Sequence, residues 1–102
     1  MSDKQDQLQV RRTLRALTVL FGREVMGLRP SEIAKGIQES PSTVTRLMAA
    51  MEDEGYAERV PGREDAWRLG PKLVQGAIAH QRGLAEIQRQ LNEVTQRYSR
   101  AP

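Results

Sequence analysis

Short polar side chains and one arginine gather at the start of the third predicted helix. The first turn of a helix presents unpaired N–H groups at the positive end of its dipole, so Ser42 and Thr43 there can hold a phosphate. Thr45 and Arg46 can reach base edges, and the Arg46 guanidinium has the forked donor geometry that suits guanine. Ala49 is small enough to approach a thymine methyl group. These residues predict contact with duplex DNA, while an ordinary solvated helix face carrying one arginine is the alternative.

Further arginines surround a predicted hairpin. Arg59 and Arg68 lie on its strands and Arg63 in its turn, where they can straddle a nucleic-acid backbone or probe the minor groove, and Arg29 precedes the second helix. The alternative is a solvated turn in which the two acidic residues after Arg63 neutralise it. The predicted DNA-binding residues are therefore Ser42, Thr43, Thr45, Arg46, Ala49, Arg63, Arg59, Arg68 and Arg29.

Residues for covalent, acid–base or metal chemistry are scarce. The chain has no cysteine and a single histidine, His80, without nearby partners. The acidic run at residues 52–54 splays around a helix end. We therefore expect no enzyme, no metal site and no cofactor. The polar start and the lack of a long apolar run predict a cytoplasmic protein with no membrane partner.

Charge is unevenly distributed along the 102 residues, whose formal net charge is +3. Basic residues outnumber acidic ones in residues 1–30 and 59–102, whereas residues 31–58 are acidic. Basic flanks suit a polyanionic partner. The acidic centre suits a rival function, in which the same fold serves as a protein-docking module without specific DNA binding.

Apolar periodicity places three helices in the first half of the chain. Residues 1–7 read as a disordered arm, and a helix is expected from Leu8 to about Arg23. Pro30 and Pro41 suit the first position of two further helices, ending near Ile37 and Glu54. The residues expected on the buried faces of the three helices are Val10, Leu14, Leu17, Phe21, Ile33, Ala34, Ile37, Val44, Leu47, Met48 and Met51.

A hairpin and a long helix are expected to complete the chain. Strand candidates at 56–60 and 66–69 flank the turn-forming residues 61–65, with Tyr56 and Trp67 as core rings. The fold class is thus mostly α with a small β-hairpin: a winged helix-turn-helix domain over residues 8–70, followed by a C-terminal helix within 71–102.

The C-terminal helix carries a heptad seam, formed by Leu73, Ala77, His80, Leu84, Ile87, Leu91, Val94 and Tyr98. Burial of this seam against a second copy predicts a homodimer that binds a palindromic operator. The expected interface residues are Leu84, Ile87, Leu91, Val94 and Tyr98. The alternative is a helix that folds back on the first helix, in which case Gly76 and Gly83 would only loosen it.

The run GLRPSEIAKGIQESPSTVTRLMAAMEDEGYAERV, followed by AWRLGPKL, resembles the N-terminal DNA-binding domain of the isocitrate lyase regulator (IclR) family. The resemblance spans roughly residues 15–73. It implies a recognition helix at 41–54, a wing at 61–65 and DNA-facing roles for Ser42, Thr43, Thr45 and Arg46. Members usually continue into an effector domain, for which this chain has no room. We therefore expect no small-molecule effector, and either a stand-alone regulator of the kind that phages and mobile elements carry or a piece of a longer protein. The resemblance also implies a bacterial or phage-encoded protein associated with the nucleoid.

The sequence as a whole predicts a transcriptional regulator, with repression as the expected mode. It is expected to bind double-stranded DNA sequence-specifically as a homodimer, with helix 41–54 in the major groove and residues 61–65 on the backbone or minor groove.

Overall fold

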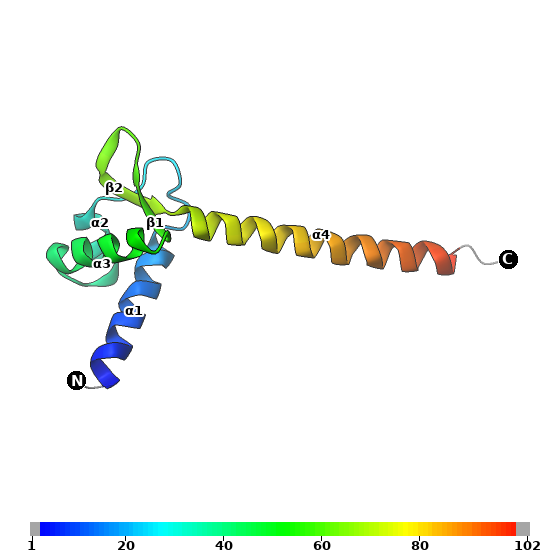
Figure 1. The fold of residues 1–102 in the computed structure, drawn as a ribbon, viewed down its shortest axis with the longest axis horizontal. Helices are drawn as coiled ribbons and strands as arrows, with labels where there is room; N and C mark the ends of the chain where they lie inside the picture. The colour runs from blue at the N-terminus through cyan, green and yellow to red at the C-terminus, as the bar shows by residue number, and fades with distance from the viewer. Residues whose placement is uncertain (1–2, 100–102) are drawn as a thin grey trace.

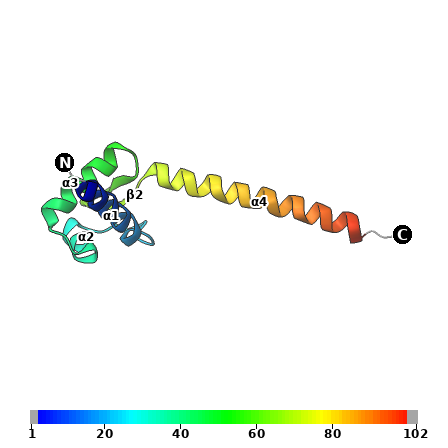
Figure 2. The same ribbon diagram turned by 90° about the horizontal axis from the view of Figure 1, so that it is seen from below.

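The computed structural model describes residues 3–99. Its elements are α1 (Asp3–Val19), α2 (Pro30–Ile37), α3 (Pro41–Asp53), β1 (Ala57–Val60), β2 (Arg63–Leu69) and α4 (Pro71–Ser99). Figure 1 shows α1, α2, α3 and the hairpin gathered at one end, while α4 projects away from them, as it also does in the view of Figure 2. The structure confirms the predicted winged helix-turn-helix with a long C-terminal helix.

The first helix differs from the prediction in its start, its end and its buried face. It begins at Asp3, so the expected disordered arm is wrong for residues 3–7, while residues 1–2 lie outside the described part. Asp3 and Asp6 stabilise its first turn through the helix dipole. The helix ends at Val19 instead of Arg23, before Gly22, which adopts a positive φ.

Ala16 of α1 and Leu20, directly after the helix, are fully buried, and Leu17 packs against the core as predicted. The expected core residues Val10, Leu14 and Phe21 are instead 58%, 57% and 60% exposed. On a helical projection they lie about 120° away from the buried side. The helix therefore carries two apolar sides, and only one of them packs within the domain.

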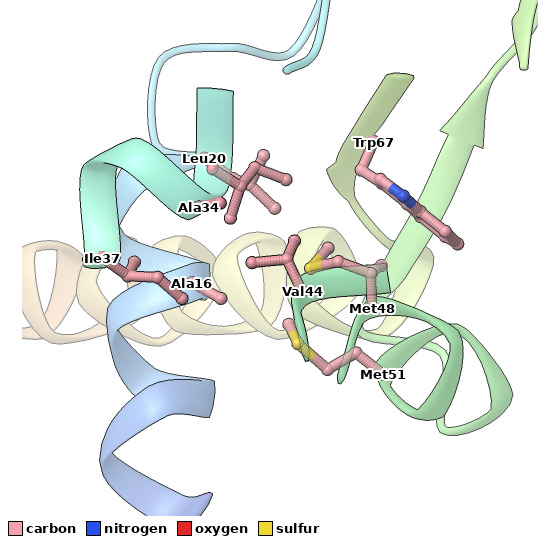
Figure 3. Close-up of a cluster of buried hydrophobic side chains, with 10 residues drawn as sticks. Ala16, Leu20, Ala34, Ile37, Val44, Met48, Met51 and Trp67 are labelled. Atoms are coloured by element: carbon pink, nitrogen blue, oxygen red, sulfur yellow. The ribbon is translucent and has the colours of Figure 1, made fainter. Parts of the chain in front are cut away.

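The core lies between α1, the helix pair α2–α3 and the hairpin. Ile33, Ala34 and Ile37 of α2 are buried as predicted. Val44, Met48 and Met51 form the buried side of α3, with Leu47 packed at its edge. Figure 3 shows Trp67 of β2 beside Met48, and the ring is 2% exposed, as predicted. Tyr56 is 40% exposed, so its expected place in the core is wrong.

The hairpin is antiparallel, and Arg59 pairs with Trp67. The second strand starts at Arg63, three residues before the predicted start, because the register shifts after Arg59 and brings Val60 opposite Arg63. The connection between the strands is thus a tight turn at residues 61–62. Leu28 forms a bridge with Trp67 through two backbone hydrogen bonds of 2.8 Å, which pins the long 20–29 connection against the hairpin.

Gly27 sits at the tightest point of this connection, and a side chain there should be costly. A Cβ at Gly27 would lie 2.5 Å from the Trp67 carbonyl oxygen, and its φ is +67°. We expect Gly27→Ala to lower the free energy of unfolding by about 2–5 kcal/mol, from left-handed strain plus overpacking. Urea titration followed by the fluorescence of the single tryptophan measures this change.

Gly22→Ala is the matched control for that experiment. Gly22 also has a positive φ, of +82°, but a Cβ there meets nothing within 4 Å. We expect only the strain cost of about 1–2 kcal/mol. Equal losses in the two variants would contradict a close approach between Gly27 and Trp67.

The last helix, α4, runs for 29 residues and none of them is fully buried. Its first turn is attached to the domain by hydrogen bonds from Lys72 N–H to Gly55 O (3.0 Å) and from Gly70 N–H to Tyr56 O (2.9 Å). Over residues 3–99, none of the helices combines the length and the apolar character needed to cross a membrane.

Candidate nucleic-acid interface

The N-terminus of α3 is capped by a network of hydroxyl groups. Ser40 Oγ accepts a hydrogen bond from Thr43 N–H (3.2 Å), donates to Thr43 Oγ1 (2.9 Å) and lies 3.2 Å from Ser42 Oγ. Because Ser40 gives its only proton to Thr43, the Thr43 hydroxyl proton has no acceptor within residues 3–99. This helix end therefore offers hydroxyl groups and the backbone N–H of Ser42 at the positive end of the dipole, which is the chemistry of an anion contact.

The outward side of α3 brings together the predicted base-reading residues. Thr45 and Arg46 are exposed, and Ala49 is half-buried next to them. Thr45 Oγ1 donates to Pro41 O (3.0 Å), so its lone pairs remain available to accept. Within the described residues, Arg46 has no hydrogen-bond or ion-pair partner. The guanidinium of Arg46 is thus free to meet an external acceptor without breaking an internal contact.

The other predicted DNA-binding arginines lie around the hairpin, and each has an internal partner. Arg29 Nε is 2.7 Å from Asp65 Oδ2, and Arg63 Nη1 donates to Met26 O (2.9 Å). The acidic neighbours of Arg63 therefore do not neutralise it, contrary to the alternative considered for the turn. The structure separates this group from the polar cluster at the start of α3.

The arginines on the two strands are held more firmly. Arg68 Nε lies 2.6 Å from Glu58 Oε2, and its Nη1 donates to Glu24 O (3.2 Å). The Arg59 guanidinium stacks 4.5 Å from the centre of the Trp67 ring, and its Nη1 donates to Glu64 O (3.0 Å). These contacts hold the hairpin and the 20–29 connection together.

Acidic residues near α3 are either paired or distant from its polar start. Glu39, in the turn before α3, lies 3.0 Å from Arg12 Nε, in a pair not aligned as a hydrogen bond. Both side chains are only about one-fifth exposed, at 18% and 20%. The acidic run of residues 52–54 lies at the opposite end of α3, about 16 Å along the axis from Ser42. Among residues 3–99, the acidic centre therefore leaves the polar start of α3 free of unpaired carboxylates.

The contribution of α1 is the feature that sequence reasoning missed. A polar hollow of about 540 Å³ separates α1 from α3, lined by Gln9 and Arg12 on one side and by Thr43 and Arg46 on the other. The predicted first helix already contained Gln9 and Arg12, but its position beside α3 depends on how the helices pack, which periodicity alone does not give. The signal available in the sequence was the polar side of α1, where Gln9 and Arg12 follow one another at a three-residue step.

Comparison with known proteins gives one family and one fold. The IclR helix-turn-helix domain matches residues 9–61, which contain most of α1, all of α2 and α3, and the first strand. The HTH-type transcriptional regulator PrsX of Escherichia coli is 41% identical over 49 residues, as is PrsX of E. coli O6:H1. The match covers 48% of this chain and 30% of PrsX, so the chain spans less than a third of these relatives.

A solved structure supports the fold alone. A mutant form of Lactococcus lactis ZitR superposes with a TM-score of 0.50 at 21% identity, over 80% of this chain and 60% of that one.

Proposed function

The chain belongs to the IclR helix-turn-helix domain family, and we propose that it regulates transcription by binding double-stranded DNA sequence-specifically as a homodimer. A helix-turn-helix regulator domain is a DNA-binding module, and the chain is not an enzyme. The observation that carries the proposal is Arg46, exposed and unpartnered among residues 3–99, which lies beside the hydroxyl-capped start of α3 within the matched segment.

In the proposed complex α3 enters the major groove. Ser42 and Thr43 contact a phosphate, and Arg46 contacts O6 and N7 of a guanine. Because the Thr45 hydroxyl donates to Pro41 O, it contacts a base as an acceptor, which favours the amino group of cytosine or adenine. Ala49 lies against a thymine methyl group. This assignment gives α3 the sequence preference and its first turn the anchoring role.

The wing adds contacts that do not depend on sequence. Arg63 exchanges its hydrogen bond to Met26 O for a phosphate, since its other donors remain free to turn outward. Arg29, Arg59 and Arg68 keep their internal partners and position the wing, adding positive potential near the backbone.

Arg63→Ala should weaken binding to all DNA sequences alike. We expect the slope of log affinity against log salt to fall by about 0.9 for each phosphate that the variant no longer neutralises, with the base preference unchanged. Fluorescence anisotropy at several salt concentrations measures the slope.

The control for that experiment is Arg82→Ala, which removes the same charge from α4 at an exposed position. It should retain the wild-type slope. A normal slope for Arg63→Ala, or an equal change in both variants, would remove the wing from the interface.

The homodimer is proposed to form through α4. Every large seam residue from Leu84 to Tyr98 is exposed in the single chain, as expected of a surface that a partner covers. Most residues beside the seam are neutral, at positions 81, 83, 88, 90 and 95, and Arg97 is the one charged residue there, so two identical helices can meet with little repulsion between like charges. The charged residues lie on the opposite side of α4, where Arg89 pairs with Glu86 and Glu93 and lowers the pKa of the Glu86 carboxyl.

Selection from a random duplex DNA pool tests the proposal. A dimer with two reading helices should enrich a palindrome whose half-sites are about one helical turn apart. Occupation of such a site excludes other proteins from the same DNA, so we propose repression. Enrichment of a single, non-repeated motif would reject the dimer. No enrichment would reject specific DNA binding and favour the protein-docking module.

A further inference from the structure

Two apolar surfaces of the chain have no partner within residues 3–99. One is the seam of α4. The other is a groove of about 400 Å³ between α1 and α3, here called the α1–α3 groove, whose walls include Leu17, Leu47, Ala50, Met51 and Tyr56. Both surfaces are mainly apolar and lie open to solvent in the single chain.

The α1–α3 groove lies beside the origin of α4. Tyr56, on its rim, accepts the hydrogen bond from Gly70 N–H that precedes the first turn of α4. From there α4 leads away from the domain without a break, as Figure 1 shows. The far half of α4 therefore cannot reach the groove of its own chain, and an occupant must come from another molecule.

We propose that two copies pair through antiparallel α4 helices centred between Leu84 and Ile87, so that the end of each α4 docks in the partner's α1–α3 groove. The inference rests on the homodimer proposed above and adds its direction, its register and a second contact surface.

The sizes of the seam residues favour the antiparallel direction. In this register Leu73 faces Tyr98 of the other copy, Ala77 faces Val94, His80 faces Leu91, and Leu84 faces Ile87. Leu73 and Ala77 thus each meet a larger residue, His80 meets an apolar leucine, and Leu84 meets a residue of its own size. A parallel pair would place Ala77 against Ala77 and His80 against His80, which leaves one layer underfilled and one polar.

The same register brings the end of α4 to the groove. Tyr98 comes to lie beside the partner's Leu73, in the first turn of that helix, close to Tyr56 on the groove rim. Three of the residues that line the groove belong to α3, namely Leu47, Ala50 and Met51. A partner helix docked there supports the reading helix from its inner side.

The register also determines how far apart the two domains lie. Leu73 and Tyr98 are 25 positions apart in the helix, so the two Leu73 residues are separated by about 38 Å along the helix axis. One turn of DNA spans about 34–36 Å. An antiparallel dimer therefore separates its domains by about the distance between successive major-groove sites on one face of the duplex.

Engineered cysteines test the direction, because the chain has none of its own. The variant Ala77→Cys/Val94→Cys should form disulfide-linked dimers under mild oxidation, whereas each single variant should stay unlinked. The control Ala79→Cys/Val94→Cys moves the first thiol to the opposite side of α4 and should not link. Linkage of either single variant to itself would show a parallel pair and overturn the proposal.

A second pair tests docking in the groove. Ala50→Cys/Tyr98→Cys should be joined between chains by a short bismaleimide, and Ala49→Cys/Tyr98→Cys, with its thiol on the DNA-facing side, should not. Linkage at 77 and 94 without linkage at 50 and 98 would overturn the docking. A monomer in light scattering would overturn the dimer as well, and loss of specific DNA binding is judged separately by the selection experiment.

Discussion

A variant with Leu84→Asp and Leu91→Asp is expected to be a folded monomer that binds a palindromic operator about 10²- to 10⁴-fold more weakly than the wild type. Both side chains are more than half exposed in the single chain, at 53% and 57%, so their replacement removes no contact of the domain core. Two carboxylates buried in the seam without partners would destabilise the dimer by more free energy than the remaining seam contacts contribute. The affinity falls because the second half-site is no longer bound at the high effective concentration that the dimer provides.

The control is Ala85→Asp with Asn92→Asp, which adds two negative charges at the positions that follow each leucine, away from the seam. This variant should remain dimeric. Light scattering gives the mass, and anisotropy with full and half operators gives the affinity. Half-operator binding should be similar in all three proteins. A dimeric Leu84→Asp/Leu91→Asp protein, or a monomer with wild-type affinity, would remove α4 from the dimer contact.

The elements that were predicted well have strong local signals. Pro30, Pro41 and Pro71 each open a helix, and the apolar spacing of α2 and α3 gives the sides that are buried. The tight turn and the longer β2 were missed because backbone pairing extends through the charged residues after Arg63. Apolar periodicity indicates which side chains are buried, whereas the pairing of the strands depends on main-chain hydrogen bonds.

The error on α1 has a different cause. Val10, Leu14 and Phe21 form the more apolar side of this helix, and the actual core contact uses the smaller side with Ala16 and Leu20. An apolar stripe indicates a covered surface but not which molecule covers it. The strongest apolar stripe of a helix therefore need not face the core of its own chain.

The helix that carries the candidate site could be predicted from the sequence, but the ion pairs of the nearby arginines could not. Ser42, Thr43, Thr45 and Arg46 follow from the start of α3 and its period. The pairing of Arg29 with Asp65, 36 positions away, depends on how the hairpin meets the 20–29 connection. The pairing of Arg12 with Glu39 likewise depends on how α1 crosses the turn before α3. Such pairs decide which arginines are free, and they appear only once the elements are packed.

Arg46 should therefore account for most of the base preference. We expect Arg46→Ala to weaken binding to the best operator by about 1–3 kcal/mol for each half-site, roughly 5- to 150-fold. The preference for guanine at one position of each half-site should disappear, while nonspecific binding in low salt falls only by the loss of one charge. Selection and sequencing with the variant measure the preference, and competition binding measures the affinity.

The variant Arg46→Lys distinguishes the contribution of the forked hydrogen bond to binding from the contribution of the positive charge. Lysine keeps the positive charge but loses the planar pair of donors, so nonspecific affinity should be retained and the guanine preference reduced. Because Arg46 has no internal partner among residues 3–99, both variants should keep the wild-type free energy of unfolding within about 0.5 kcal/mol. Arg68→Ala, by contrast, also breaks the contacts to Glu58 and Glu24, so a loss of binding there would mix stability with recognition. If Arg46→Ala selects the same motif as the wild type, the base contact belongs to another residue and α3 is anchored differently on the DNA.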